Sequence, residues 1–184
     1  MDQTVLIILV VVAVAVLLAG YAYAVQQRRR QLRDRFGPEY ERAVNTATNV
    51  AAAEASLKQR MERVNRFKLH ALTAEQADAF ARDWRRVQAL FVDDPHRAVT
   101  EADSLVGQVM AARGYPLEEF DQRADDLSVD HPRVVQNYRI ARSLTERLRS
   151  GDVGTEELRV AVINYRALID DLLRVDEPQR RRAS

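Results

Sequence analysis

Twenty-one consecutive residues, Val5 to Val25, carry no charge, and this stretch limits what the chain can fold into more than any other feature of the sequence. About 20 apolar residues in a helix are enough to cross the hydrocarbon core of a bilayer. Inside that core a helix satisfies every backbone N–H and C=O group within a single segment. We therefore expect a membrane-spanning helix, along which lie Val5, Leu9, Val14, Leu18 and Val25.

The apolar segment has the features of a retained anchor more than those of a cleaved signal peptide. A signal peptide has a positively charged start, a core of about 7–15 apolar residues and a cleavage site of small residues. Residues 1–3 contain no Lys or Arg, and Tyr21 and Tyr23 stand where an interfacial aromatic belt would lie. Ala22-Tyr23-Ala24 does resemble a cleavage site. In that alternative the remainder of the chain would be exported.

Five arginines follow the apolar segment, at Arg28, Arg29, Arg30, Arg33 and Arg35. Basic residues close to a membrane helix are biased to the cytoplasmic side. We therefore expect a single-pass protein of the inner (cytoplasmic) membrane, with its N-terminus outside and its C-terminal domain in the cytoplasm. We interpret the arginines as topology determinants that also attract anionic lipid headgroups. Specific binding of lipid or nucleic acid is the alternative interpretation.

The net charge of +1 is unevenly distributed along the chain. Residues 1–36 hold five arginines and two aspartates, and residues 180–184 hold three arginines, so residues 37–179 have a net charge of −5. An acidic body argues against nucleic-acid binding, which requires a basic face. The absence of cysteine excludes disulfides and thiolate chemistry. We divide the chain into an anchor with its basic segment (1–36), a helical domain (37–176) and a basic tail (177–184).

Apolar periodicity predicts an all-α protein, with the transmembrane helix followed by an antiparallel bundle of about five helices. The sequence Thr73-Ala-Glu-Gln76 has the pattern of a capping box, and Asp94-Pro95 has that of a helix start. These signals predict helices over residues 74–91 and from 95 to Gly114. Further helices are expected over residues 116–127, from the Asp130-His131-Pro132 sequence to residue 149, and from residue 155 onward.

The segment Pro38–Arg66 is expected to form one long helix. Its apolar positions repeat with heptad spacing, interrupted by one charge at Glu54. We favour packing within the bundle over self-association as a coiled coil, because a coiled coil sustains its heptads for longer. The heptad positions are Ala43, Ala47, Val50, Glu54, Leu57, Met61 and Val64.

The sequence contains no recognisable catalytic or cofactor-binding motif. It has no glycine-rich phosphate loop, no G-x-S-x-G and no H-E-x-x-H. Two of the three histidines, His96 and His131, stand close to aspartates, but helix capping explains Asp94 and Asp130 without a metal. Asp170 and Asp171 are interpreted as part of a solvated helix face. We therefore expect no enzymatic activity, no cofactor and no metal site.

One part of the body is denser in Tyr, Arg and Asp than a helical bundle requires. Tyr and Arg are enriched where proteins bind partners. The candidate partner surface comprises Tyr115, His131, Arg133, Tyr138 and Arg139. A structural alternative, which we favour, is a buried tyrosine hydroxyl bonded to an Arg or Asp across the bundle.

Three sequence blocks resemble a widespread family of small, membrane-anchored bacterial proteins of uncharacterised function. The blocks are RFGPEYERAV, LFVDDPHRAVTEADSLV and RGYPLEEFDQRADDLSVDHPRVVQNYR, and the resemblance extends over residues 35–173. The resemblance implies a shared helical fold and a membrane anchor. It implies no activity and no catalytic residues.

The partners expected from the sequence are the membrane and other proteins, and no nucleic acid. The pairs Ala15/Ala19 and Gly20/Ala24 have the small-x-x-x-small spacing that lets two membrane helices approach, so a homodimer is a further possibility. The sequence thus predicts a tether or scaffold at the membrane. Binding of anionic lipid or nucleic acid through the arginine clusters, and an enzyme with an unrecognised site, are the alternatives.

Overall fold

The computed structural model describes residues 3–116, 118–151 and 153–174, with backbone alone for residues 4–10. All regular secondary structure in these ranges is α-helical, in eight helices and without a strand. The predicted all-α class is therefore confirmed. The chain divides into two compact units, residues 1–57 (unit 1) and residues 58–184 (unit 2). The border predicted at residue 36 lies inside unit 1.

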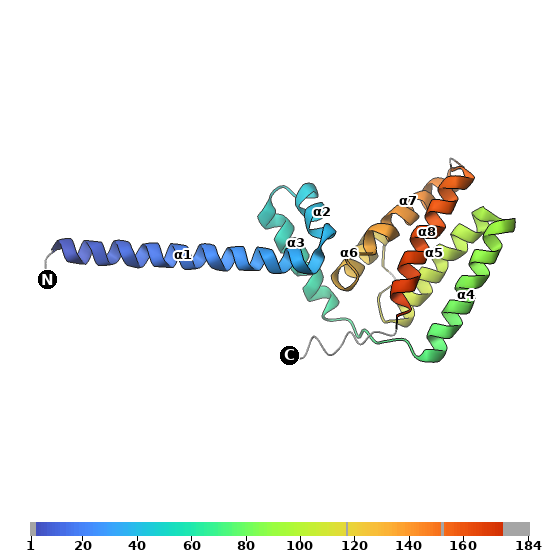
Figure 1. Ribbon diagram of the computed structural model, residues 1–184, viewed down its shortest axis with the longest axis horizontal. Coiled ribbons are helices and arrows are strands. Elements are labelled where there is room, and N and C mark those ends of the chain that lie inside the picture. Colours follow the sequence, from blue (N-terminus) through green and yellow to red (C-terminus); the bar gives the residue numbers. More distant parts are fainter. Residues whose placement is uncertain (1–2, 117, 152, 175–184) are drawn as a thin grey trace. The chain divides into compact units, whose positions relative to one another are not determined.

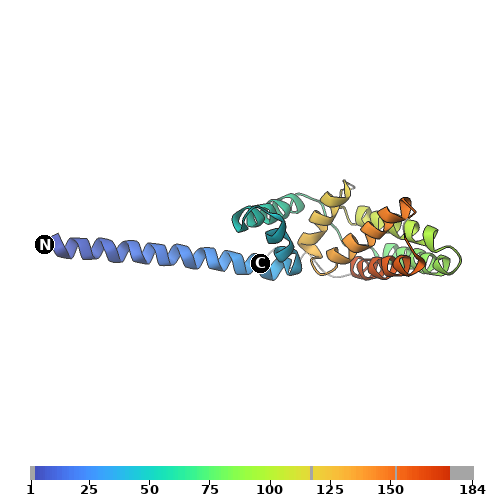
Figure 2. The ribbon, with the colours of Figure 1, turned by 90° about the horizontal axis from the view of Figure 1, so that it is seen from above.

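Unit 1 is built on α1 (Gln3–Phe36), a single uninterrupted helix of 34 residues that Figures 1 and 2 both show as straight. At 1.5 Å per residue it is about 50 Å long. Gly37, with φ of 49°, ends α1, and Pro38 begins α2 (Pro38–Thr46). Glycine adopts positive φ without steric cost, and proline suits the first position of a helix. The predicted break at Gly37-Pro38 is confirmed.

The expected single helix over residues 38–66 is wrong, because the chain leaves the helical conformation between α2 and α3 (Val50–Val64). Ala47 has extended backbone, with φ of −85° and ψ of 160°. The Thr46 hydroxyl donates to the Arg42 carbonyl, and the Asn49 side chain accepts the Ala52 N–H at 2.8 Å. Such side chains compete with the helical backbone, and they start and stop helices. The heptad positions are consequently split between two helices.

Unit 2 contains the C-terminal part of α3 and five further helices. These are α4 (Ala74–Asp93), α5 (Pro95–Ala112), α6 (Phe120–Asp130), α7 (Val135–Arg149) and α8 (Thr155–Leu172). α5 packs against both α4 and α8, and α7 packs against α8, as Figure 1 shows. Their apolar faces form one buried core that includes Trp84, Val106, Leu127, Tyr165 and Ile169. Seven helices therefore follow α1 in the described ranges, and not about five.

Two of the predicted helix starts in unit 2 are confirmed and one is wrong. Thr73 and Gln76 form the capping box of α4, and the Asp94 carboxylate accepts the Arg97 N–H at 3.0 Å at the start of α5. Asp130 caps nothing, because α6 extends to Asp130 itself and α7 begins only at Val135. The Asp130 carboxylate instead accepts a hydrogen bond from the Tyr115 hydroxyl at 3.1 Å.

Candidate functional site

The exposed apolar surface of α1 is the most distinctive feature of unit 1. Within the described residues, Val11–Phe36 is the one segment long and apolar enough to cross a membrane. Every side chain from Val11 to Ala24 is exposed, including Val14 at 48% and Leu18 at 63%. Val25 is half-buried. The predicted positions Val5 and Leu9 lie on α1, but their side chains are outside the described residues.

Two of the five arginines that follow the apolar segment make ion pairs within unit 1. The Arg29 guanidinium lies 3.2 Å from the Glu54 carboxylate, and that of Arg33 lies 3.1 Å from Glu41. Arg33 also lies over the Tyr40 ring, 5.2 Å from its centroid. The Tyr40 hydroxyl donates to Glu54 at 3.0 Å, and burial together with this carboxylate raises the pKa of Tyr40. Glu54, the charge that interrupts the heptad, thus bonds to both α1 and α2.

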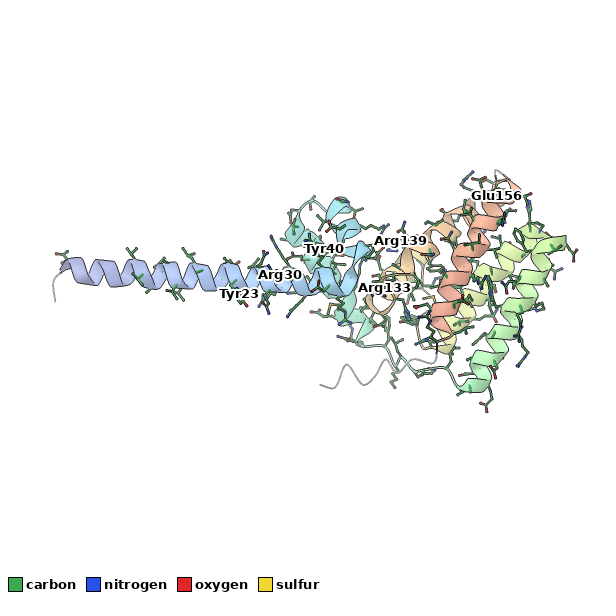
Figure 3. The ribbon with its side chains drawn as sticks, in the orientation of Figure 1. Tyr23, Arg30, Tyr40, Arg133, Arg139 and Glu156 are labelled. Carbon is green, nitrogen blue, oxygen red and sulfur yellow. The ribbon has the colours of Figure 1, made fainter. Side chains whose placement is uncertain are left out.

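All five arginines are exposed, so the remaining three differ from Arg29 and Arg33 in their ion pairs and not in their exposure. Arg28, Arg30 and Arg35 make no ion pair with any residue in the described part of the chain. Arg30 lies seven residues, or about two helical turns, beyond Tyr23 on α1. Figure 3 labels both residues on this helix. The helix therefore presents paired arginines on one face and unpaired ones on others.

A buried polar network joins three helices of unit 2. The Tyr165 hydroxyl on α8 bonds to Asp103 on α5 at 3.0 Å and to Thr145 on α7 at 2.9 Å. Arg142 on α7 bonds to the second oxygen of Asp103 at 2.5 Å. Burial, followed by the Asp103 charge, raises the pKa of Tyr165. Because these groups satisfy one another, the network fixes the register of α5, α7 and α8.

The neighbouring Tyr138 hydroxyl is buried without a hydrogen-bond partner among the described residues. The Tyr138 ring packs edge-on against Phe120, with centroids 4.9 Å apart. Burial raises the pKa of Tyr138 to about 12. The hydroxyl is thus held neutral in the core.

A second polar cluster attaches the end of α3 to α6 and α7. Asp125 pairs with Arg60 and with Arg139, each at 3.0 Å, and Asp126 pairs with Arg63 at 2.6 Å. Burial raises the pKa of Asp126, against the lowering effect of Arg63. The sequence offered one signal for this cluster, the i, i+3 spacing of Arg60 and Arg63, but the acidic partners are more than 60 residues away.

A third cluster holds the C-terminal end of α8. The His131 ring nitrogen Nδ1 lies 2.5 Å from the Asp171 carboxylate, and Arg113 donates to the Leu172 carbonyl. The hydrogen bond to His131 lowers the pKa of Asp171. The sequence predicted that Asp170 and Asp171 lie on a solvated helix face. Asp170 is exposed, as predicted. The prediction is wrong for Asp171, because this side chain points toward His131 in the α6–α7 connection.

The candidate partner surface predicted from the sequence has one exposed member. Arg133 is exposed, whereas Tyr115 and Tyr138 are buried at 4% and 0% exposure. The His131 and Arg139 side chains are 13% and 12% exposed and lie within the clusters described above. Figure 3 labels Arg133 and Arg139 close to α6 and α7. The Tyr115–Asp130 hydrogen bond is of the kind that the structural alternative expects.

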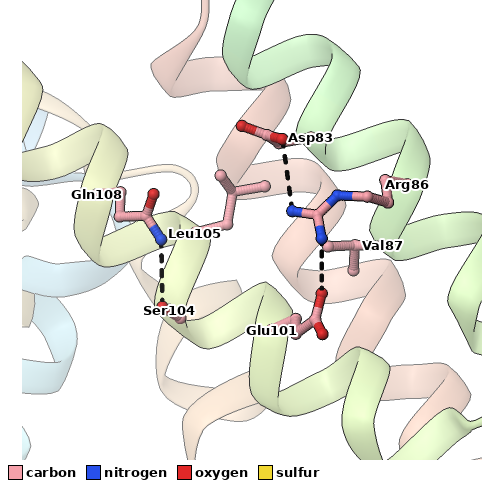
Figure 4. Close-up of a pocket in the computed structure, with 7 residues that line it drawn as sticks. All are labelled: Asp83, Arg86, Val87, Glu101, Ser104, Leu105 and Gln108. Atoms are coloured by element: carbon pink, nitrogen blue, oxygen red, sulfur yellow. Dashed lines mark hydrogen bonds and ion pairs between the residues drawn. The ribbon is translucent and has the colours of Figure 1, made fainter.

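The pocket between α4 and α5 has the wrong character for a small-molecule site. It has a volume of about 230 Å³ and is lined by Asp83, Arg86, Val87, Glu101, Ser104, Leu105 and Gln108 (Figure 4). Small-molecule sites are enclosed, mostly apolar and about 300–1,000 Å³. Here Arg86 extends between Asp83 at 3.4 Å and Glu101 at 3.5 Å. The single cationic side chain of the rim is thus already paired within the pocket wall.

Neither candidate metal ligands among the described residues nor comparisons with known proteins assign a function to this arrangement. In the described ranges, no group of three His, Cys, Asp or Glu side chains is placed to hold a metal ion. Comparison of the chain with protein-family models, with curated proteins and with solved structures finds no match. The family resemblance noted in the sequence stays a prediction.

Proposed function

We propose that this protein is a single-pass membrane protein that holds a helical domain at the cytoplasmic face of the inner membrane, as a tether or scaffold for other proteins. The observation that carries the proposal is the unbroken exposure of apolar side chains from Val11 to Ala24. In water a contiguous apolar surface of this length would promote aggregation. In a bilayer the same surface faces lipid.

The basic end of α1 supports the proposed orientation. The helix continues without interruption from the apolar segment into the five arginines. Arginines adjoining a membrane helix favour the cytoplasmic side, so the N-terminus is proposed to lie outside. The predicted tail arginines, residues 180–182, lie outside the described residues.

The helices of unit 2 are proposed to form an antiparallel bundle. Arg147, near the end of α7, pairs with Glu157, near the start of α8, at 2.7 Å. At the other end, His131, just before α7, pairs with Asp171 close to the end of α8. Contacts at both ends in this order are typical of two neighbouring antiparallel helices with a short connection.

The anchor and its orientation are tested with a reporter fused after Ser184, together with alkaline extraction of membranes. We expect the protein to resist extraction and a cytoplasm-dependent reporter to be active. Release of the intact protein by alkali would contradict the anchor. Activity of an export-dependent reporter alone would contradict the orientation.

The tether role is tested by crosslinking in cells, purification through a C-terminal tag and mass spectrometry. We expect a reproducible partner protein that is lost in Arg133→Ala but retained in Arg85→Ala. Both substitutions remove an exposed arginine. Arg133 lies in the α6–α7 connection and Arg85 lies on α4. Tyr138→Ala is unsuitable, because Tyr138 is fully buried. Recovery of crosslinked dimers alone would favour self-association through the small residues of α1, and recovery of nothing would contradict the tether.

A further inference from the structure

The five arginines after the apolar segment lie on different faces of α1. Arg29 and Arg33, four residues apart, share a helix face with Leu32 and Phe36, which are 7% and 0% exposed. This is the face on which α2 packs, and both arginines make ion pairs there with glutamates of unit 1. Arg28 and Arg30 lie to either side of that face and are exposed.

The position of each arginine along α1 sets its distance from the bilayer. With a rise of 1.5 Å per residue, Arg28 and Arg30 lie about 4.5 Å and about 7.5 Å beyond Val25. Each headgroup layer is about 5–8 Å thick, given a hydrocarbon core of about 30 Å and a total thickness of about 40–45 Å. Helical side chains point back toward the N-terminus, which here is toward the membrane.

We infer that Arg28 and Arg30 bind the phosphate groups of anionic phospholipids, whereas Arg29 and Arg33 hold unit 1 together. The guanidinium group matches phosphate with two parallel hydrogen bonds. Neither arginine makes an ion pair with a carboxylate among the described residues. This inference rests on the proposed membrane anchor and adds a lipid class to it.

Arg35 provides the matched control. It has the same charge as Arg28, it is exposed, and it makes no ion pair with a described residue. It differs in distance, since it lies about 15 Å beyond Val25, outside the headgroup layer. If distance from the bilayer decides lipid contact, Arg35 contributes much less than Arg28.

The experiment uses the full chain reconstituted into phosphatidylcholine vesicles that contain a trace of spin-labelled phosphatidylcholine or phosphatidylglycerol. The fraction of label immobilised by the protein gives the preference for the anionic lipid. We expect a preference for phosphatidylglycerol over phosphatidylcholine that weakens in high salt. Arg28→Gln and Arg30→Gln are each expected to lower this preference about fivefold. Arg35→Gln and Arg29→Gln are expected to keep most of the preference. Arg29→Gln is expected instead to speed amide hydrogen exchange in α3, since Glu54 loses its ion pair with α1 and keeps only the hydrogen bond from Tyr40.

Flotation of each variant with neutral vesicles separates the two proposals. A chain that fails to float is not inserted, and the anchor itself is then wrong. A chain that floats but shows no preference for phosphatidylglycerol leaves the anchor intact and overturns the lipid inference. An equal loss in Arg35→Gln or Arg29→Gln would also overturn it, because general charge and not position would then govern lipid contact.

Discussion

Two buried tyrosine hydroxyls of unit 2 differ in whether they have partners, and this difference predicts opposite effects on stability. The Tyr165 hydroxyl bonds to Asp103 and Thr145. Tyr165→Phe therefore leaves the Asp103 carboxylate without one of its hydrogen-bond donors. We expect this substitution to lower the free energy of unfolding by about 1–2 kcal/mol. The Tyr138 hydroxyl has no partner among the described residues, so Tyr138→Phe is expected to be neutral or stabilising by up to about 1 kcal/mol.

The single tryptophan allows this comparison in the full chain. Trp84 lies in the core of unit 2 at 5% exposure, and its fluorescence therefore reports the unfolding of unit 2 in denaturant. Measurement in detergent micelles keeps the apolar segment covered. A larger loss of stability in Tyr138→Phe than in Tyr165→Phe would contradict the assignment of the polar network.

The His131–Asp171 pair predicts a pH dependence on the acid side. The hydrogen bond to His131 lowers the pKa of Asp171 from its ordinary value of 3.8. A carboxyl with a lowered pKa stabilises the fold above its ordinary value, and this stabilisation disappears as pH falls through the lowered pKa. Asp171→Asn is therefore expected to be less stable than the unsubstituted chain at neutral pH, with a gap that closes below pH 3.8.

The neighbouring carboxyl is the control for this measurement. Asp170 is exposed and lies 3.6 Å from Arg166, a surface pair of the kind that contributes little. Asp170→Asn is expected to change the unfolding free energy by less than about 0.5 kcal/mol throughout the titration. A gap for Asp171→Asn that stayed constant down to the lowest pH would contradict the role of the His131 bond.

The connections between helices of unit 2 contain two glycines with positive φ, and they predict different costs for the same substitution. Gly151 (φ 77°) ends the α7 turn with open space where a Cβ would lie. Gly114 (φ 89°) follows α5, and a Cβ there would lie 2.5 Å from the Lys68 carbonyl oxygen of the α3–α4 connection. Gly151→Ala is expected to cost about 1–2 kcal/mol through backbone strain alone.

Gly114→Ala adds a backbone clash to the same strain. Because the Lys68 segment is also held by the His70 N–H bonded to the Arg113 carbonyl at 3.1 Å, it cannot move away freely. We expect a cost at least about 1–3 kcal/mol greater than that of Gly151→Ala, measured by Trp84 fluorescence in denaturant. Equal costs would mean that the α3–α4 connection does not pack on the end of α5.

Sequence patterns predicted those helix ends whose determinants are local. The Thr73 capping box and the Asp94 cap depend on residues three positions apart, so spacing alone was sufficient. The break between α2 and α3 was missed because the apolar periodicity continues through it, while the side chains of Thr46 and Asn49 end and restart the helix. Local patterns thus predicted helices better than their interruptions.

The polar contacts of unit 2 could not be predicted, because their partners are distant in the chain. Asp103 and Tyr165 are 62 residues apart, and only the packing of α5 against α8 brings them together. The same holds for the five arginines that follow the apolar segment. Their sequence predicted a basic cluster at the membrane, but its division into paired and unpaired members depends on where Glu41 and Glu54 lie.

At the scale of the whole molecule, the apolar segment of α1 and the core of unit 2 belong to separate compact units. This separation predicts that each can be disrupted without the other. Val14 lies near the middle of the Val5–Val25 segment, where an arginine costs about 2.5–3.5 kcal/mol of insertion free energy. Tyr23 lies near its end, where an arginine reaches the interface. Val14→Arg is therefore expected to lower the alkali-resistant membrane fraction strongly, and Tyr23→Arg to leave it nearly unchanged.

The same prediction also concerns the stability of unit 2, which we expect Val14→Arg to leave unchanged. Since Val14 lies in unit 1 and is 48% exposed, its substitution removes no contact of the Trp84 core. Val14→Arg in detergent is expected to unfold at the same denaturant concentration as the unsubstituted chain, followed by Trp84 fluorescence. A lowered midpoint would show that α1 contributes to the fold of unit 2. An unchanged membrane fraction would contradict the membrane-spanning helix. The apolar face of α1 would then be covered by a partner protein and not by lipid.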